Sequence, residues 1–302
     1  MKTRLLATAF ALSLALLFSP SLLQAQTISF KPVTKFSYPG ANSTGAYGIN
    51  DAGDVVGAYV LPGADYANGF VRHADGTFES IVYPGSTVYQ TFATAINNQG
   101  VIAGWFNTDD GSVVTHGFFL SNGVYTSFDY PTAAITNIYG INDAGDFVGN
   151  YTMPGGAPYH GFASIGGQLS EVTVPGTTYV EPHDINNRGD IVGWANTVTG
   201  SYGFRLQSKG TRYPITPSRN TFTSFLGTND TKASVGTEGG GLPVALYYGG
   251  GKNFVVYNFP GLTFNNFTGI NHRGLICGYG YDDAAGILYS YLVRLVTTES
   301  TQ

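Results

Sequence analysis

The feature that most constrains this chain is a ten-residue motif that occurs six times. Each copy has the order Gly-Ile-Asn, a turn glycine and a final Val-Gly, with small departures. The copies begin near residues 48, 95, 140, 184, 227 and 269, at spacings of 42 to 47 residues. A repeat of this period is typical of architectures in which one supersecondary unit packs on the next. We therefore predict one repeat domain over residues 26–302.

Each repeat contains four predicted strands. The first runs into the Ile-Asn pair, the second ends in Val-Gly, the third contains Gly-Phe as at 117–118, and the fourth runs into proline as at 81–84. Apolar and polar residues alternate with a period of two, and proline ends a strand where no ladder donor is needed. Four-stranded units of this length are typical of β-propeller blades.

Recurrent asparagines lie between the first and second predicted strands. They are Asn50, Asn97, Asn142, Asn186, Asn229 and Asn271. Asparagine and glycine supply the backbone conformations and the side-chain hydrogen bonds of a hairpin turn. We interpret these residues as turn formers, and a ring of ligand-binding asparagines is the alternative. The fifth copy departs most, because Lys232 replaces the turn glycine.

The two ends of the chain predict how the repeats close. The sixth repeat stops near 291–293 without a proline-ended fourth strand, and the N-terminal segment 36–40 supplies one. Its proline stands ten residues before Ile49, which is also the spacing from Pro131 to Ile141. We therefore predict an all-β fold, a six-bladed β-propeller of four-stranded blades, closed by the N-terminal strand that completes the last blade.

The first 25 residues predict export. Lys2 and Arg4 precede an apolar run over 5–18, and a small-residue cleavage site ends at Ala25. This order is typical of a secretory signal peptide, and the run is shorter than the roughly 20 residues of a membrane span. We expect residues 1–25 to be removed and the protein to be secreted, to the extracellular space or the periplasm, without a membrane span.

Composition narrows the possible partners. From residue 26 onward the chain has a formal net charge of −7 and no run of Lys or Arg, so nucleic acid and anionic membranes are excluded as expected partners. The single cysteine, Cys277, allows no intramolecular disulfide and falls at a small apolar position of the repeat. Closed sheet edges and the net charge favour a monomer.

Motifs for cofactors and metals are missing from the sequence. No phosphate loop, nucleophile elbow or zinc motif occurs, so we expect no cofactor. The acidic turns at 50–54 and 142–146 resemble calcium loops only faintly, because they lack the regular alternation of oxygen ligands and the distal glutamate. We therefore expect no metal site.

The repeated core resembles the HAF-type extracellular repeat proteins of bacteria. The resemblance is carried by the Gly-Ile-Asn to Val-Gly motif, the His-Gly-Phe strands at 116–118 and 160–162, and the proline-glycine ending at 84–85. It covers nearly all of residues 26–302. It implies export and a repeat fold, and it implies no established reaction and no catalytic residues.

Candidate ligand-binding residues follow from the expected fold. The first strand of each propeller blade lines the central channel, and the positions two before the anchor isoleucine place Tyr47 and Tyr139 there. Trp105, Trp194 and Tyr279 hold equivalent positions near the ends of second strands. Aromatic side chains at a loop mouth suit carbohydrate or protein recognition, so we expect these five residues to contact a ligand.

The fourth repeat carries an unusual polar cluster. Glu181, His183 and Asp184 place two carboxylates and an imidazole on the innermost strand, near Trp194. A hydrolase or lyase needs such groups for acid–base catalysis, so the three are candidate catalytic residues. The alternative is that Asp184 bonds a turn and Glu181 is solvated in a loop.

The sequence favours a secreted binding module for an extracellular carbohydrate or a cell-surface protein, acting through the loop face or the channel mouth. The repeats share no catalytic residue, which favours binding over catalysis. The alternative is a polysaccharide-degrading hydrolase or lyase that uses the Glu181–Asp184 cluster. A third hypothesis is an extracellular scaffold that binds no small ligand.

Overall fold

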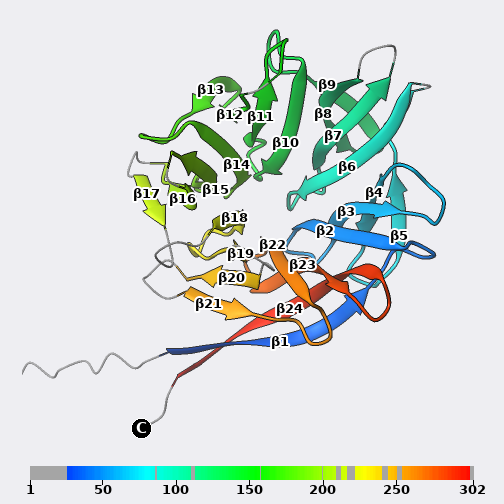
Figure 1. The fold of residues 1–302 in the computed structure, drawn as a ribbon, viewed down its shortest axis with the longest axis vertical. Helices are drawn as coiled ribbons and strands as arrows, with labels where there is room; N and C mark the ends of the chain where they lie inside the picture. Colours follow the sequence, from blue (N-terminus) through cyan, green and yellow to red (C-terminus); the bar gives the residue numbers. More distant parts are fainter. Residues whose placement is uncertain are drawn as a thin grey trace, which may run out of the picture.

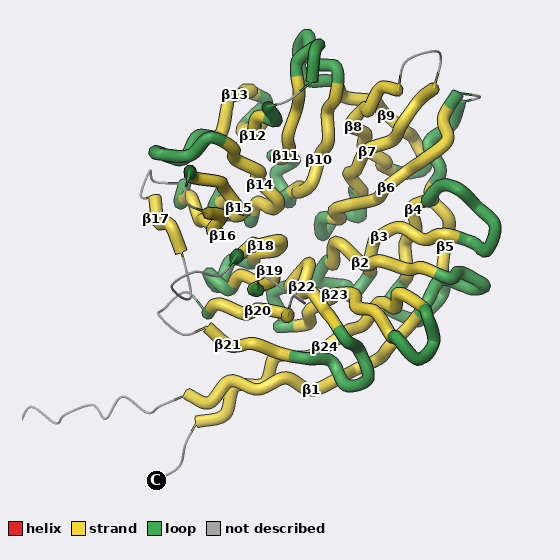
Figure 2. Tube along the Cα trace, viewed as in Figure 1, coloured by secondary structure: helices red, strands yellow, loops and turns green. Residues whose placement is uncertain are grey.

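The structure is a computed structural model that describes residues 26–85, 87–109, 113–156, 158–198, 200–208, 212–215, 222–239, 244–249 and 254–299. These residues form β-strands joined by turns and loops, and none of them is helical (Figure 2). Within this part of the chain there is accordingly no helix able to cross a membrane. The predicted all-β class is confirmed, whereas the predicted signal peptide at 1–25 lies outside the described residues.

Antiparallel pairing joins the strands into groups of four, one group for each repeat. Single parallel bridges join the groups of repeats six and one, and those of repeats two and three, into eight-stranded sheets. The first three groups are β2 (Ser43–Ile49), β3 (Val55–Val60), β4 (Asn68–Arg72) and β5 (Phe78–Ile81); β6 (Val88–Ile96), β7 (Ile102–Asp109), β8 (Val113–Ser121) and β9 (Val124–Phe128); β10 (Ile135–Ile141), β11 (Phe147–Thr152), β12 (His160–Ile165) and β13 (Gln168–Val172). The next two are β14 (Tyr179–Ile185), β15 (Ile191–Thr197), β16 (Gly200–Leu206) and β17 (Arg212–Ile215); β18 (Thr223–Thr228), β19 (Ser234–Glu238), β20 (Val244–Tyr248) and β21 (Phe254–Tyr257). The last group is β22 (Phe264–Ile270), β23 (Leu275–Asp282), β24 (Ile287–Glu299) and β1 (Gln26–Phe36).

The N-terminal strand belongs to the last group. β1 pairs antiparallel with β24, from Gln26 opposite Glu299 to Phe36 opposite Ser290. The ladder therefore ends where the predicted segment 36–40 begins, so the strand lies further toward the N-terminus than the sequence suggested. In Figure 1 the two strands cross the lower part of the molecule side by side.

The first strand of every group lies innermost. Figure 1 shows β2, β6, β10, β14, β18 and β22 around a common centre, with the later strands of each group farther out. Contacts between the first and last repeats complete this arrangement: Ser290 Oγ donates to the carbonyl of Thr44 at 2.9 Å, and Ser43 pairs with Leu288 in a single parallel bridge. Repeats one and six are therefore neighbours in space.

The core of each repeat is a large side chain on the third strand, packed over a glycine on the second. These side chains are all fully buried: Phe70, Phe118, Phe162, Phe204, Leu246 and Tyr291. At Gly57, a Cβ atom would lie 2.0 Å from the Gly45 carbonyl oxygen and 2.7 Å from the Phe70 ring. The final glycine of the repeated motif is thus required by close packing.

The turn interpretation of the recurrent asparagines is confirmed. In the fourth repeat, Asn186 Oδ1 accepts from the backbone N–H groups of Arg188 (3.0 Å) and Asp190 (2.9 Å). The turn glycine has a positive φ, as at Gly189 (76°), and Lys232 adopts the same conformation with a φ of 68°. The fifth repeat therefore keeps the turn although it lacks the glycine.

The same asparagines also join neighbouring repeats. The Nδ2 groups of five of the six donate to the backbone carbonyl of the next: Asn97 to Asn142 (3.1 Å), Asn142 to Asn186 (3.2 Å), Asn186 to Asn229 (3.0 Å), Asn229 to Asn271 (3.0 Å) and Asn271 to Asn50 (2.9 Å). Asn50 Nδ2 donates to Asp54 Oδ2 at 3.3 Å. One side chain thus supports its own turn through the oxygen and the adjacent repeat through the nitrogen.

We expect Asn186→Ala to lower the free energy of unfolding by about 2–4 kcal/mol, because it leaves buried turn groups and the Asn229 carbonyl without partners. Asn186→Asp is the matched variant. It keeps the oxygen acceptor of the turn but loses the Nδ2 donor, so it isolates the contact between repeats. Denaturant unfolding measures both, and an Asn186→Asp protein as stable as the wild type would contradict the inter-repeat role.

Candidate functional site

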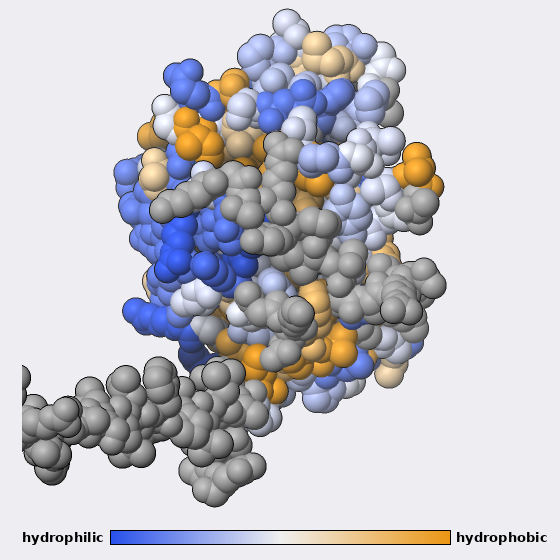
Figure 3. All heavy atoms as spheres, turned by 90° about the vertical axis from the view of Figure 1, so that its left-hand side faces the viewer, coloured by the Kyte–Doolittle hydropathy of each residue, from blue (hydrophilic) through white to orange (hydrophobic). Residues whose placement is uncertain are grey.

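The face seen in Figure 3 lies on the side of β13 and β17 in Figure 1. Hydrophilic residues gather left of its centre, and hydrophobic residues gather along its lower part and in smaller groups higher up. The exposed large hydrophobic residues among those described include Ile165 and Leu169 of the third repeat, Val198 of the fourth and Val256 of the fifth. Single exposed apolar residues are ordinary on protein surfaces, whereas side chains from all six repeats converge at the centre of the molecule.

A kink in every inner strand aims one side chain at the centre. In all six, the pairing register with the next strand shifts by one residue at the position two before the anchor. The residues at this β-bulge are Tyr47, Thr94, Tyr139, His183, Leu226 and Thr268. A bulge redirects the side chain of its extra residue. All six side chains line one central cavity of about 220 Å³.

Three further aromatic residues complete this space, which we call the aromatic cavity. Phe92, Trp105 and Tyr279 line it together with the six bulge residues. The Phe92 and Trp105 rings stack with centroids 4.2 Å apart, and Tyr47 contacts both Phe92 (6.2 Å) and Tyr279 (6.0 Å). Repeats one, two and six therefore form an aromatic wall.

The opposite wall is polar and comes from repeats three and four. His183 Nε2 lies 2.9 Å from Glu181 Oε1, and the His183 ring stacks on Tyr139 at 4.8 Å. Asn150 Nδ2 donates to Glu181 Oε2 at 3.2 Å, and the Tyr179 hydroxyl donates to the same oxygen. Glu181 is thereby held by several partners, with its side chain only 13% exposed.

The surroundings of Glu181 favour its ionised form. Burial by itself would raise the pKa of Glu181, but the hydrogen bond and the charge of His183, with the bonds from Tyr179 and Trp194, outweigh burial and lower the pKa. Burial and the neighbouring Glu181 raise the pKa of Tyr139 well above its usual value. The site thus combines a carboxylate, an imidazole in contact with it, and a neutral phenol.

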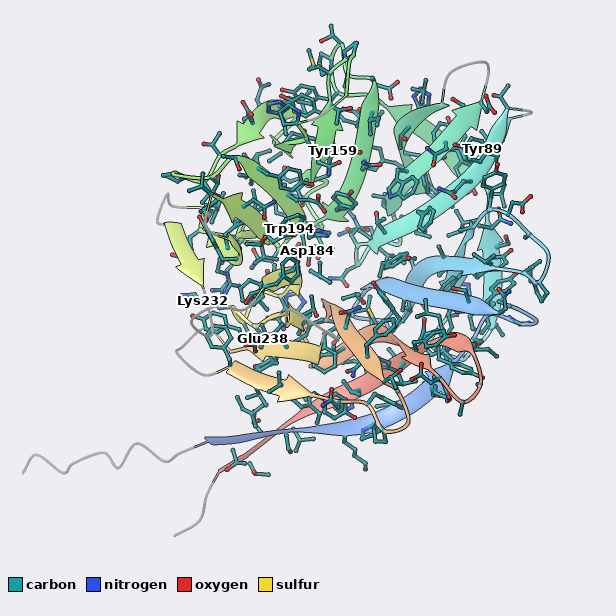
Figure 4. The ribbon with its side chains drawn as sticks, viewed as in Figure 1. Tyr89, Tyr159, Asp184, Trp194, Lys232 and Glu238 are labelled. Carbon is teal, nitrogen blue, oxygen red and sulfur yellow. The ribbon has the colours of Figure 1, made fainter. Side chains whose placement is uncertain are left out.

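Asp184 does not belong to this cluster. The bulge at His183 turns the next residue away, and the Asp184 carboxylate accepts backbone N–H groups from Thr228 (2.8 Å) and Ile185 (2.9 Å). Asp184 contacts both neighbouring repeats: a Cβ atom at Gly140 of repeat three would come within 2.6 Å of its Cα, and its carboxylate accepts from Thr228 of repeat five. Figure 4 shows its position near the centre of the molecule.

The five expected ligand-binding residues divide into two sets. Tyr47, Trp105, Tyr139 and Tyr279 line the aromatic cavity. Trp194 does not, although it occupies the same position in its repeat as Trp105; its ring packs on Tyr179 at 4.9 Å and on Phe222 at 5.9 Å. Trp194 supports Glu181 from the side, near the centre in Figure 4.

Sequence reasoning missed part of the polar wall. Asn150 occupies the position in its repeat that Trp105 and Trp194 occupy in theirs. Comparing the repeats position by position could therefore have identified Asn150 as a candidate site residue. Tyr179 had no such signal, because its contact with Glu181 depends on a side-chain direction within β14.

A second, smaller space of about 80 Å³ lies at the other end of the inner strands, where the turns meet. Here the residue that follows each recurrent asparagine donates its backbone N–H to the side chain of the equivalent residue in the next repeat. In order, these residues are Asp51, Asn98, Asp143, Asn187, Asp230 and His272, and His272 donates to Asp51. His272 Nε2 lies 2.7 Å from Asp230 and Nδ1 lies 3.1 Å from Asp51. Within the described part of the chain, no group of three or more His, Cys, Asp and Glu side chains is arranged to hold a metal ion.

Comparisons with known proteins bear on the fold. No family model matches the chain, and no curated protein does. Similar solved structures include a putative TolB from Agrobacterium tumefaciens (TM-score 0.58, 12% identity, covering 90% of this chain and 99% of that one) and a mutant of AofleA from Arthrobotrys oligospora (TM-score 0.53, 11% identity, covering 92% and 91%). The structural neighbours are β-propeller proteins, and likeness at this identity establishes the fold class alone. The chain therefore has a β-propeller-like, all-β fold.

Proposed function

We propose that this protein is a six-bladed, closed β-propeller that acts as an exported binding module, with its ligand held in the aromatic cavity. The pairing of β1 with β24 and the contacts between repeats six and one support the blade count and the closure. The repeat motif supports membership of the HAF-type extracellular family, and the basic, apolar N-terminus supports secretion.

The observation that carries the proposal is the composition of one cavity. All six repeats contribute to it, and aromatic side chains from repeats one, two and six share it with His183, which contacts Glu181. Binding sites are typically concave and apolar, with a few converging polar groups. A volume of about 220 Å³ is below the roughly 300–1,000 Å³ of drug-sized sites, so the cavity suits a single ring or head group. A carbohydrate unit or a side chain of a surface protein fits this description.

We expect a ligand of this cavity to raise the melting temperature of the protein beginning at residue 26, because it binds only the folded state. A panel of neutral sugars, amino sugars and small ammonium compounds supplies the test. Trp105→Leu is expected to weaken binding of the positive compound at least about tenfold by removing stacking area. Tyr66→Leu is the matched control, since Tyr66 is an exposed tyrosine that does not line the cavity.

A second candidate function is acid–base catalysis, favoured by the 2.9 Å contact between His183 and Glu181. A carboxylate that orients an imidazole is a common device for a general base, and Tyr139 beside His183 is a proton donor in its neutral form. The same experiment separates the candidates. Product release that His183→Ala abolishes would favour a hydrolase or lyase, whereas ligand binding without product that depends on Trp105 favours the module.

A further inference from the structure

The aromatic cavity has many ring surfaces and no Lys or Arg side chain among its described lining residues. Five of its lining residues are Phe, Tyr or Trp, and none of the described residues that line it or the turn-side space is Lys or Arg. The ring faces of Trp, Tyr and Phe carry partial negative charge and attract cations. No Lys or Arg side chain among the described lining residues lies on these ring faces.

The hydroxyl groups of the wall are largely committed to the protein. Thr94 Oγ1 donates to the carbonyl of Ile138 at 2.7 Å, and Thr268 Oγ1 donates to the carbonyl of Ala46 at 2.9 Å. The Tyr139 hydroxyl accepts a bond from Asn150 at 3.4 Å. A ligand with many hydroxyl groups would lose water here and find few free partners, which costs binding free energy for each unpaired group.

Fixed negative charge lies at both ends of this space. Glu181 contacts His183, which lines the cavity. The hydrogen bonds that Glu181 accepts and the charge of His183 lower its pKa and keep the carboxylate ionised. Asp51 and Asp143 line the turn-side space, which shares Tyr47 and Tyr139 with the aromatic cavity. Carboxylates in a confined, low-dielectric channel raise the local concentration of cations.

We propose that the group bound in the aromatic cavity is an organic ammonium ion, held on the faces of the aromatic wall and facing the Glu181–His183 pair. This inference rests on the proposed function and specifies the chemical class of its ligand. Two sources supply such a group: a quaternary ammonium compound and the protonated amine of an amino sugar. Both carry a compact positive charge, which ring faces and one carboxylate recognise.

The test compares choline with dimethylbutanol, its neutral isostere in which a quaternary carbon replaces the nitrogen. Isothermal calorimetry on the protein from residue 26 is expected to give a dissociation constant about tenfold lower for choline. Equal affinities, or tighter binding of the alcohol, would overturn the inference. Glucosamine measured against glucose identifies the source, since a preference for glucosamine over both glucose and choline assigns an amino sugar.

Two variants test the residues. Glu181→Gln keeps the size of the side chain and one acceptor oxygen while removing its charge, so it is expected to weaken choline binding about tenfold and to leave the alcohol unchanged. Trp105→Leu is expected to weaken both, and Tyr66→Leu neither. Neutral sugars that bind tightly in a Trp105-dependent manner, with no response to choline, would refute the cation and leave the binding module intact. Absence of Trp105-dependent binding for every compound would refute both.

Discussion

Removing residues 26–36 is expected to abolish the cooperative thermal transition of the protein. These residues form β1, and their loss leaves ten positions of β24, from Ser290 to Glu299, without a ladder partner. Phe30 also leaves the core, where its ring lies 5.1 Å from Tyr257 and 5.3 Å from Phe267. Loss of one such Phe costs about 3–5 kcal/mol, against about 5–15 kcal/mol for a whole domain.

The measurement is calorimetry of chains that begin at residue 26 and at residue 37. Two point substitutions in β1 separate the loss of its contacts from the effect of shortening the chain. Phe30→Ala is expected to lower the free energy of unfolding by about 3 kcal/mol, whereas Val33→Ala is expected to change it by less than about 0.5 kcal/mol. Val33 lies three residues away on the same strand and is 51% exposed. A shortened chain that melts at the temperature of the longer one would show that β1 does not stabilise the fold.

Asp184→Asn is expected to stabilise the protein at pH 8 and to have little effect at pH 4. Burial raises the pKa of Asp184 from 3.8 to about 7, partly offset by the N–H groups of Thr228 and Ile185. Since the folded pKa lies above the unfolded value, the wild type loses stability as the pH rises from about 4 to about 7, and the loss is complete above that range. The change corresponds to at most about 4 kcal/mol. An asparagine avoids this cost of ionisation, although its single amide oxygen accepts only one of the two bonds, because Thr228 and Ile185 donate to different carboxylate oxygens.

Urea unfolding at pH 4, 6 and 8 measures this difference. The control is Asp283→Asn, which changes an exposed carboxyl in the turn between β23 and β24 and is expected to alter stability by less than about 0.5 kcal/mol throughout. If the difference in stability between Asp184→Asn and the wild type were the same at all three pH values, burial would not raise the pKa of Asp184 in the folded protein.

Most of the fold could be predicted because its signals are local. The alternation around Gly117 and Phe118, the asparagine turns and the proline stops lie within a few residues, and hydrophobic period and turn chemistry act at that range. The role of the N-terminal strand was also readable from the spacing of Pro39. Its bounds were not, because pairing of 26–36 depends on the length of β24, more than 250 residues away.

The candidate site was only partly predictable. Tyr47 and Tyr139 could be placed on the channel because inner strands recur in register, yet Asp184 could not be separated from His183 by sequence alone. The bulge at His183 inserts an extra residue into the strand, so the regular alternation of side chains does not predict the surroundings of either neighbour. His183 lines the aromatic cavity, whereas Asp184 accepts backbone N–H groups.

Trp105 and Trp194 illustrate what the sequence determined and what tertiary structure decided. The repeat determined their common position at the end of a second strand, because that position follows from local pattern and turn spacing. Packing decided that Trp105 stacks on Phe92 in the cavity wall while Trp194 packs on Tyr179 beside Glu181. The cavity exists only where side chains from six repeats converge, and their direction depends on neighbours far apart in the chain.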